Sequence, residues 1–267
     1  MQTFIAAAIQ MVSTPDVVGN LKTAERLIAQ AAASGAQLLV LPEYFAIMGQ
    51  RDSDKLAVKE AFGGGPIQDF LAAQAARHQV WLVGGTIPLV GDDAIRVRNA
   101  CLAYDPHGRC VARYDKIHLF GFDNGEERYA EADTIEPGGE VTVFDTPFGR
   151  VGLAVCYDLR FPELFRREAV DVWVLPAAFT ATTGRAHWEV LLRARAIENQ
   201  CFVVAAAQGG LHVTGRETFG HSEIVDPWGQ VLACLPTGEG VAQAELKSSQ
   251  LDRVRRILPA LRHRRLG

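Results

Sequence analysis

A cysteine follows a short apolar run near the middle of the chain, in the segment VGLAVCYDLRFPE. The run Val151–Val155 predicts a buried strand that ends at Cys156. In α/β folds, reactive groups gather where strands end and helices begin, and Pro162 suits the first turn of a following helix. The spacing therefore indicates a nucleophilic thiol, with the N–H of Tyr157 as half of an oxyanion hole. Taken alone, Cys156 is equally well explained as an inert buried cysteine.

Two further residues with reactive side chains also come directly after apolar runs. Glu43 follows Gln37–Leu41, and Lys116 follows Arg109–Tyr114. A thiol has an ordinary pKa of about 8.5, so it needs a base to become a thiolate near neutral pH, and a buried carboxylate can act as that base. A lysine ammonium favours the thiolate and can stabilise an oxyanion. A capping acid and a solvated cation would explain Glu43 and Lys116 singly, but not why all three residues end strands.

The elements that must position these residues alternate between α/β units and hairpins, which predicts one mixed sheet or two, covered by helices. We predict helices over 20–33 with Asn20 as its cap, Ile67–His78, Pro162–Ala169 and Gly184–Asn199, and a long loop over Gly121–Pro137. The predicted strands are Thr3–Met11, Gln37–Leu41, Val80–Thr86, Arg98–Tyr104, Arg109–Tyr114, Val141–Asp145, Arg150–Val155, Val172–Pro176, Cys201–Ala207, Ser222–Asp226, Gln230–Leu235 and Val241–Leu246.

The composition is that of one large globular domain over residues 1–267, with 48% hydrophobic residues. A net charge of −4 favours neither nucleic acid nor an acidic membrane as a partner. The run Phe4–Met11 is too short to cross a bilayer and lacks a basic lead-in, so we interpret it as a strand and not as a signal peptide. Five cysteines without regular spacing suggest no disulfide framework, and hence a reducing cytoplasm. Neither a zinc-type cysteine spacing nor a glycine-rich nucleotide motif is present, so we expect no metal and no cofactor.

The segments LPEYF, YDKIHLF and GLAVCYDLRFPEL resemble, in the same order, the three motifs of the nitrilase, or carbon–nitrogen hydrolase, superfamily. The similarity continues through EVLLRARAIENQCFVVAAAQ and HSEIVDPWGQVLA and so covers nearly the whole chain. The resemblance implies a four-layer α-β-β-α sandwich with mixed sheets. It also implies a Glu-Lys-Cys triad, with Glu43 as general base and acid, Lys116 as stabiliser of the intermediate and Cys156 as nucleophile.

The family often carries a second glutamate in the loop after the lysine motif. Glu131, in RYAEADTIEPG, aligns best with it through the Pro-Gly that follows. Glu126 and Glu127 are the nearby alternatives, and reasoning from the residues alone does not choose among the three.

The residues after the cysteine indicate a branch of the family. True nitrilases carry Trp-Glu there, whereas this chain has Tyr157-Asp158, as in the amidase-like branches. The segment DLRFPE resembles the group that includes deaminated glutathione amidase and omega-amidase, and its Phe-Pro-Glu ending favours the former. We therefore expect hydrolysis of a small carboxylate-bearing amide through a cysteine thioester, with release of ammonia from a primary amide. The segment HLFGFDNGEERY departs from the commoner HLFD version, which leaves the substrate open.

Arg160 is the candidate for gripping a substrate carboxylate, and an ion pair with Glu163 or Asp158 is the equal alternative. Other hydroxyl and aromatic groups follow strand ends and could line the pocket, although core packing explains the aromatic ones as well. These are Tyr44, Phe179, Thr180 and Thr182.

Other readings of the sequence stay open. His118 and His187 allow a Cys-His hydrolase, although a lone histidine is more often structural. A partner-binding module with a vestigial site is a second alternative, and a thiol redox sensor is a third that would need a resolving cysteine near Cys156. The tail over 248–267 carries six arginines within Arg253–Arg265, and the resemblance implies a homodimer or larger assembly to whose contact this tail could belong. A nucleic-acid arm is the less favoured explanation of the tail.

Overall fold

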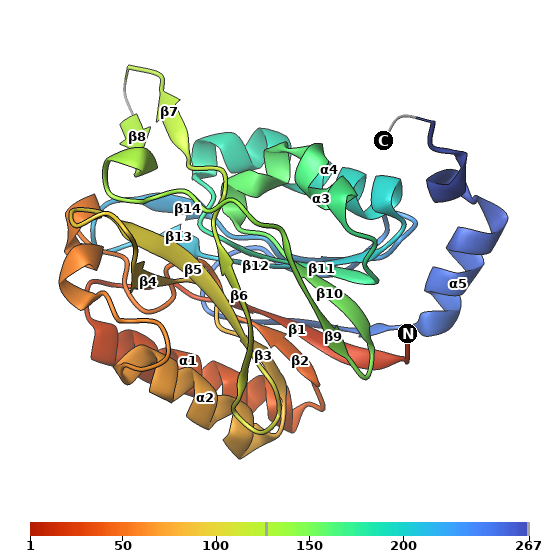
Figure 1. The fold of residues 1–267 in the computed structure, drawn as a ribbon, viewed down its shortest axis with the longest axis horizontal. Helices are drawn as coiled ribbons and strands as arrows, with labels where there is room; N and C mark the ends of the chain where they lie inside the picture. Colours follow the sequence, from red (N-terminus) through yellow and green to blue (C-terminus); the bar gives the residue numbers. More distant parts are fainter. Residues whose placement is uncertain (126–127, 266–267) are drawn as a thin grey trace.

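The computed structural model describes residues 1–125 and 128–265, so Glu126 and Glu127 lie outside the described residues. Two β-sheets face each other, and each is covered on its outer side by helices (Figure 1). Helices α1 (Val17–Ala33) and α2 (Pro66–His78) cover the first sheet, while α3 (Pro162–Arg167) and α4 (Ala181–Asn199) cover the second (Figure 1). The predicted four-layer α-β-β-α sandwich with mixed sheets is confirmed.

The first sheet places parallel strands at its centre and antiparallel strands at both sides. Its order is β17 (Gly240–Leu246), β1 (Phe4–Gln10), β2 (Leu38–Val40), β3 (Trp81–Val83), β5 (Val97–Tyr104) and β4 (Ile87–Val90), with β6 (Cys110–Asp115) also paired to β5. Because β1, β2 and β3 run parallel, with Ala6 opposite Leu38 and Leu38 opposite Trp81, their carboxyl ends share one edge of the sheet.

The second sheet repeats this design, with β10, β11 and β12 parallel at its centre. Its order is β16 (Val231–Leu235), β15 (Ser222–Val225), β12 (Phe202–Ala207), β11 (Val172–Ala177), β10 (Gly149–Leu153) and β9 (Thr142–Thr146). Two small hairpins complete the strands, namely β7 (Gly121–Asp123) with β8 (Arg128–Ala130) and β13 (Gly209–Leu211) with β14 (Glu217–Phe219).

Alternation along β1 explains how one strand serves two cores. Ala6 and Ala8 belong to the cluster between the two sheets, whereas Ala7 and Ile9 belong to the cluster beneath α1 and α2. Both faces of the strand are buried, which is why its sequence is a continuous apolar run. The small alanines let the two sheets approach closely, and this approach brings the ends of their central strands together.

Three details of the predicted elements were wrong. Helix α1 begins at Val17, and Asn20 lies inside it, where its side-chain amide donates to the carbonyl of Ala46 at 2.9 Å. The segment Gly121–Pro137 is not only a loop, because it contains the hairpin β7–β8 and a 3₁₀ turn at Glu131–Asp133. Strands β4, β13 and β14 were missed, since three- or four-residue strands carry too few positions to show an alternation.

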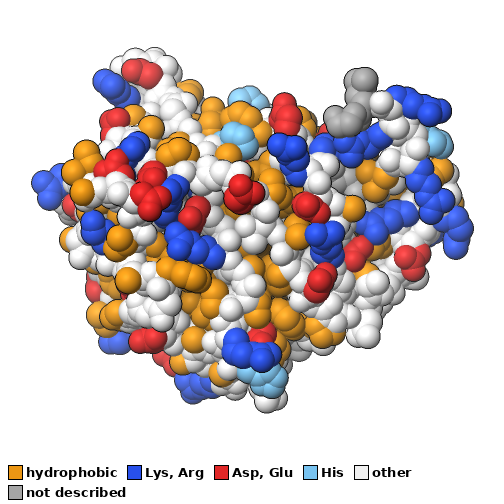
Figure 2. All heavy atoms as spheres, in the orientation of Figure 1, with side chains coloured by type: hydrophobic (Ala, Val, Ile, Leu, Met, Phe, Trp, Pro, Cys, Tyr) orange, Lys and Arg blue, Asp and Glu red, His pale blue; other side chains and the backbone are white. Residues whose placement is uncertain are grey.

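The basic tail forms α5 (Ser248–Ile257), which packs on the body through Leu251 and Val254. Arg255 is tied down by an ion pair with Asp171 at 2.8 Å. Lys and Arg side chains gather over α5 and the segment after it (Figure 2). The exposed arginines there are Arg253, Arg256, Arg262, Arg264 and Arg265.

Candidate active site

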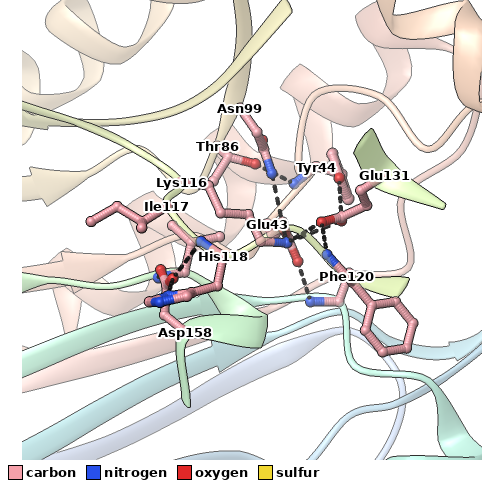
Figure 3. Close-up of polar contacts among 12 residues, drawn as sticks. Glu43, Tyr44, Thr86, Asn99, Lys116, Ile117, His118, Phe120, Glu131 and Asp158 are labelled. Carbon is pink, nitrogen blue, oxygen red and sulfur yellow. Dashed lines mark hydrogen bonds and ion pairs between the residues drawn. The ribbon is translucent and has the colours of Figure 1, made fainter. Parts of the chain in front are cut away.

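Glu43 lies three residues past the end of β2 and is completely buried. One carboxylate oxygen accepts hydrogen bonds at 2.9 Å from Lys116 Nζ and from Asn99 Nδ2 on β5 (Figure 3). The other accepts the backbone N–H of Ala178 at 2.9 Å, which comes from the end of β11 in the second sheet. A buried carboxylate is tolerated only when it is paired and hydrogen-bonded, and Glu43 has both kinds of partner.

The turn after Glu43 has a constrained backbone. Tyr44 has φ 57°, in the left-handed region, and its N–H donates to Thr86 Oγ1 at 3.0 Å. Gly85, on the neighbouring turn, has φ 57°, and a Cβ there would lie 2.1 Å from the carbonyl oxygen of Pro42. Only glycine permits this approach, so the Gly84-Gly85 pair at the end of β3 fixes the path of the segment that carries Glu43.

Lys116 follows β6 and is also completely buried. Its ammonium donates to Glu43 at 2.9 Å and to the two oxygens of Glu131 at 3.0 and 2.7 Å (Figure 3). Burial acts to lower the pKa of Lys116, but the charges of Glu131 and Glu43 outweigh it and raise the pKa above its ordinary value. The lysine is therefore a fixed positive charge at neutral pH.

Glu131 opens the 3₁₀ turn after β8 and is brought to Lys116. Its carboxylate also accepts the hydroxyl of Tyr44 at 2.8 Å and the N–H of Phe120 at 2.7 Å. Burial acts to raise the pKa of Glu131, but the Lys116 ammonium and these hydrogen bonds outweigh it and lower the pKa. Of the three glutamates considered from the sequence, Glu131 is therefore in contact with Lys116, and the other two lie outside the described residues.

Cys156 opens a 3₁₀ turn at the end of β10 and has φ 49°. A non-glycine residue in this region is strained, and such turns present a nucleophile at the top of a sheet. Cys156 is buried, with 7% of the residue exposed. Burial first, and then the charge of Glu43, raise the pKa of Cys156 well above its ordinary value, against the opposing effect of Lys116. The resting thiol is therefore protonated and has a carboxylate in its electrostatic environment.

A small pocket of about 200 Å³ opens onto the thiol. Besides Cys156, its walls are Phe120, Tyr157, Ala178, Phe179, Thr180 and Thr183. Tyr157 is the second residue of the 3₁₀ turn, and the first N–H groups of a helical turn have no partner within it. Phe179 and Thr180 were predicted to line the pocket and do so, and Thr180 also caps α4 by accepting the N–H of Thr183.

The family of the chain follows from comparison with known proteins. A family model for carbon–nitrogen hydrolases matches residues 5–256. This chain belongs to the carbon–nitrogen hydrolase family. It is 42% identical to a deaminated glutathione amidase of Synechocystis sp., over 99% of each chain, and 37% identical to an omega-amidase of Xenopus laevis, over 99% of this chain and 96% of the relative. Saccharomyces cerevisiae Nit3, a solved member of the nitrilase superfamily, aligns with a TM-score of 0.90 at 30% identity, over 99% of this chain and 97% of that one.

The enzyme is accordingly a hydrolase of carbon–nitrogen bonds other than peptide bonds. Its fold brings together four groups that come from distant parts of the sequence, namely Glu43, Lys116, Glu131 and the turn of Cys156. Such a set can move a proton to and from a thiol and can hold a negative oxygen beside a fixed ammonium. Among the described residues, no cluster of His, Cys, Asp and Glu could hold a metal ion. The described helices also include none that is both long and apolar enough to cross a membrane.

Arg160 lies against two residues of the pocket wall of this hydrolase. Its guanidinium is 5.5 Å from the ring centre of Phe179 and 5.8 Å from that of Tyr157, and it approaches His187 Nδ1 at 3.3 Å. The alternative ion pair is wrong, because within the described part of the chain Arg160 has no ion pair with Asp158 or Glu163. Its charge therefore lies beside Tyr157 and Phe179, which line the pocket.

Asp158 was considered from the sequence as a marker of the amidase-like branches and as a partner for Arg160, yet it organises the nucleophile turn. It is completely buried and accepts the N–H of Val155 at 2.8 Å and the hydroxyl of Tyr114 at 2.7 Å. Its other oxygen accepts the N–H of His118 at 3.1 Å and lies 2.7 Å from His118 Nδ1 (Figure 3). The His118 ring also stacks on Phe161 at 3.7 Å, so this histidine belongs to the support of the turn and not to a Cys-His pair.

Sequence reasoning missed Asn99 and the N–H of Ala178, both of which bind Glu43. Asn99 had a signal, because it is a buried amide in the otherwise largely apolar strand β5. The backbone donor at Ala178 had none, since any residue at that place supplies the same N–H. Tyr44, predicted to touch substrate, instead binds Glu131 with its hydroxyl and lines a second pocket.

Proposed function

We propose that Cys156 is the nucleophile of this hydrolase, Glu43 its general base and acid, and Lys116 the charge that stabilises the intermediate. The observation that carries the proposal is the closed set of hydrogen bonds from Lys116 to both Glu43 and Glu131, next to a thiol on a strained turn. A cation held by two carboxylates cannot turn away during the reaction, so it is preorganised for a developing oxyanion. Glu131 fixes the ammonium in place and keeps it charged.

The reaction then follows in two halves. Glu43 takes the proton of Cys156, the thiolate attacks the amide carbon, and Lys116 Nζ together with the Tyr157 N–H holds the oxyanion. Glu43 returns the proton to the leaving nitrogen, the C–N bond breaks and a thioester remains on Cys156. In the second half Glu43 accepts a proton from water, the resulting hydroxide attacks the thioester, and the acid product leaves as the proton returns to the thiol.

We further propose that the substrate is a small amide whose acyl part carries a carboxylate, held by Arg160 beside the pocket. Deaminated glutathione is the preferred candidate, because it is the substrate named for the relative at 42% identity. The alternative is 2-oxoglutaramate, of the kind hydrolysed by an omega-amidase such as the relative at 37% identity. Both acyl parts are the same 2-oxo acid, so the pocket at Cys156 serves either one. Their leaving groups differ: deaminated glutathione releases cysteinylglycine, and only the primary amide releases ammonia.

The test is a panel of deaminated glutathione, 2-oxoglutaramate, a simple aliphatic amide and a nitrile, run with the wild type and with Cys156→Ala. Formation of 2-oxoglutarate is followed for the first two, since an ammonia assay alone would miss the first. We expect cysteine-dependent hydrolysis of deaminated glutathione above the others. A faster reaction with 2-oxoglutaramate would keep the mechanism and change the substrate. Absence of any hydrolysis, with Cys156 unreactive to iodoacetamide, would overturn the proposal and favour a binding role.

We also propose that residues 1–267 form a single domain that assembles as a homodimer or larger oligomer in the cytoplasm, without nucleic acid or membrane as a partner. The exposed arginines of α5 and the following segment offer a charged contact surface. All five cysteines are free, which suits a reducing compartment. Light scattering of the purified chain tests the assembly, and a monomer at micromolar concentration would contradict it.

A further inference from the structure

A second pocket lies behind Tyr44 and holds two cations that the mechanism does not use. It encloses about 290 Å³, and its walls include Tyr44, Met48, Arg51, Asp52, Lys55 and Arg216. Ala178 links it to the thiol pocket, because Ala178 lines the latter and belongs to one hydrophobic cluster with Tyr44 and Met48. The carbonyl of Ala178 accepts a hydrogen bond from Arg216 at 3.2 Å. The two pockets therefore adjoin each other across the residue whose N–H binds Glu43.

Lys55 is a buried cation that has no carboxylate partner among residues 1–125 and 128–265. Its residue is 8% exposed, and its ammonium donates to Thr134 Oγ1 at 3.3 Å and lies 5.1 Å from the ring centre of Tyr44. Within the described residues, Lys55 has no ion pair. Burial lowers the pKa of Lys55, against the weaker opposing charges of Asp52 and Glu131. Burying an ammonium in this way costs free energy that a bound anion would recover.

Arg216 faces the same pocket and is likewise incompletely satisfied. Its Nε is buried and has no hydrogen-bond partner in the described part of the molecule. One terminal nitrogen contacts only the sulfur of Met48 at 3.7 Å, and the guanidinium lies 5.1 Å from the ring centre of Tyr129. A guanidinium prefers two parallel hydrogen bonds to a carboxylate, and this one has none among the residues that the structure describes.

The remaining charges at the pocket leave it positive. Arg51 is exposed and forms an ion pair with Asp54 at 3.4 Å. Asp52 is the acidic residue among the walls, and it is exposed. Glu131 accepts the hydroxyl of Tyr44 and pairs with Lys116, and it is not among the walls of this pocket. Lys55 and Arg216 are thus two cations that have no ion pair within the described residues and that line one pocket.

We propose that Lys55 and Arg216 form a subsite for a carboxylate on the leaving amine of the substrate. The inference rests on the proposed function. There, the acyl part occupies the pocket at Cys156 with Arg160 beside it, and the amine departs from the other side of the scissile bond. The second pocket adjoins the reacting centre across Ala178, so an amine extended by a short peptide reaches it with its terminal carboxylate. The subsite therefore favours peptide-like leaving groups over ammonia.

The test compares two substrates that share one acyl part. We expect Lys55→Met to lower the ratio of kcat/KM for deaminated glutathione to that for 2-oxoglutaramate by roughly 10- to 100-fold, the effect of losing a hydrogen bond to a charged group. Lys55→Arg should restore most of the ratio. Lys22→Met, a loss of one exposed lysine on α1, is the matched control and keeps the wild-type ratio.

A change in the substrate gives an independent readout. Converting the terminal carboxyl of deaminated glutathione to an amide should lower kcat/KM of the wild type by a similar factor and that of Lys55→Met hardly at all. Rapid hydrolysis of deaminated glutathione with a ratio unchanged by Lys55→Met would overturn the subsite and leave the proposed function standing. A wild type that prefers 2-oxoglutaramate, or hydrolyses neither substrate, would overturn the subsite together with the preferred substrate.

Discussion

The two sheets contribute different things to the site. The first supplies the charges, because Glu43 and Lys116 lie just after its strands, and it also supplies Asn99, whose neutral amide donates to Glu43. The second supplies the nucleophile on a strained turn, together with neutral backbone donors. Charges are held by pairing with one another, whereas the thiol is held by backbone geometry. The geometry of such a site therefore depends on how the two sheets are placed relative to each other.

Two of the links between the sheets are made by buried carboxylates. In one, the carboxylate of Glu43 from the first sheet accepts the N–H of Ala178 from the second. In the other, Asp158 from the nucleophile turn accepts hydrogen bonds from Tyr114 and His118, which lie two residues before and two residues after Lys116. Each sheet thus offers one buried carboxylate to donors of the other. Three substitutions test these contacts in turn. They remove the Lys116 ammonium, the Glu43 carboxylate that carries the proton, and the Asp158 carboxylate that joins the two sheets.

Removing the central cation should have the largest effect. Lys116→Met leaves Glu43 and Glu131 facing each other in a buried site without a counter-charge, so we expect a loss of roughly 3–5 kcal/mol in the free energy of unfolding. Amide hydrolysis should fall at least roughly 10³-fold. Urea unfolding at pH 7 measures the first and steady-state kinetics the second.

The pH dependence sharpens this prediction. The pKa of Lys116 is raised in the folded state, so its stabilising contribution is fully present below its ordinary pKa and is lost only as the pH rises through the folded value. In Lys116→Met the two carboxylates can take up a proton at low pH. The loss in the free energy of unfolding relative to the wild type should therefore be smaller at pH 5 than at pH 7. A loss in the free energy of unfolding that is equal at both pH values, or no larger than that of Lys22→Met, would contradict the pairing of Lys116 with the two carboxylates.

Glu43→Gln tests whether this carboxylate acts as a base or only as a charge. Because Glu43 raises the pKa of Cys156, its removal should lower that pKa and shift the alkylation of Cys156 by iodoacetamide to lower pH. Amide hydrolysis should nevertheless fall by roughly 10²- to 10⁴-fold, since the proton carrier is gone. Faster alkylation with slower turnover is the expected signature, and Cys156→Ala gives the background from the other four cysteines. If the rates of alkylation and of amide hydrolysis instead changed in the same direction, Glu43 would not be the proton carrier.

The charged half of the site could be predicted from sequence more completely than its supports. Glu43 and Lys116 follow apolar runs and carry reactive side chains, so spacing alone identified them, and Cys156 was found in the same way. Glu131 needed the family resemblance, because nothing local distinguishes it from two neighbouring glutamates. The strands and helices that carry these residues were predicted within a few residues, since their apolar runs are long.

What escaped prediction depends on contacts between distant segments. Asp158 was interpreted as a local partner of Arg160, yet its donors Tyr114 and His118 lie about forty residues earlier. Among the described residues the hairpin β7–β8 has three pairs of residues, too few to show a pattern, although it places Glu131 at Lys116. The backbone N–H of Ala178 is invisible to any reasoning from side chains. These features arise from contacts between segments that are distant in the sequence, and the neighbouring residues in the sequence do not indicate them.

The smallest of the three effects should come from the link at Asp158. In Asp158→Asn one oxygen is replaced by an amide that points at the N–H of Val155, so a buried donor is left without an acceptor. We expect a loss of roughly 1–3 kcal/mol in stability. The turn of Cys156 loosens while Glu43, Lys116 and Glu131 stay paired, so kcat should fall by about tenfold. Thermal unfolding and kinetics measure the two losses, and Asp145→Asn, on an exposed position of β9, is the control. A variant that is as stable as the wild type but has a lower kcat would show that this link positions the nucleophile turn without adding to stability. Wild-type turnover would show that the nucleophile turn does not depend on this link.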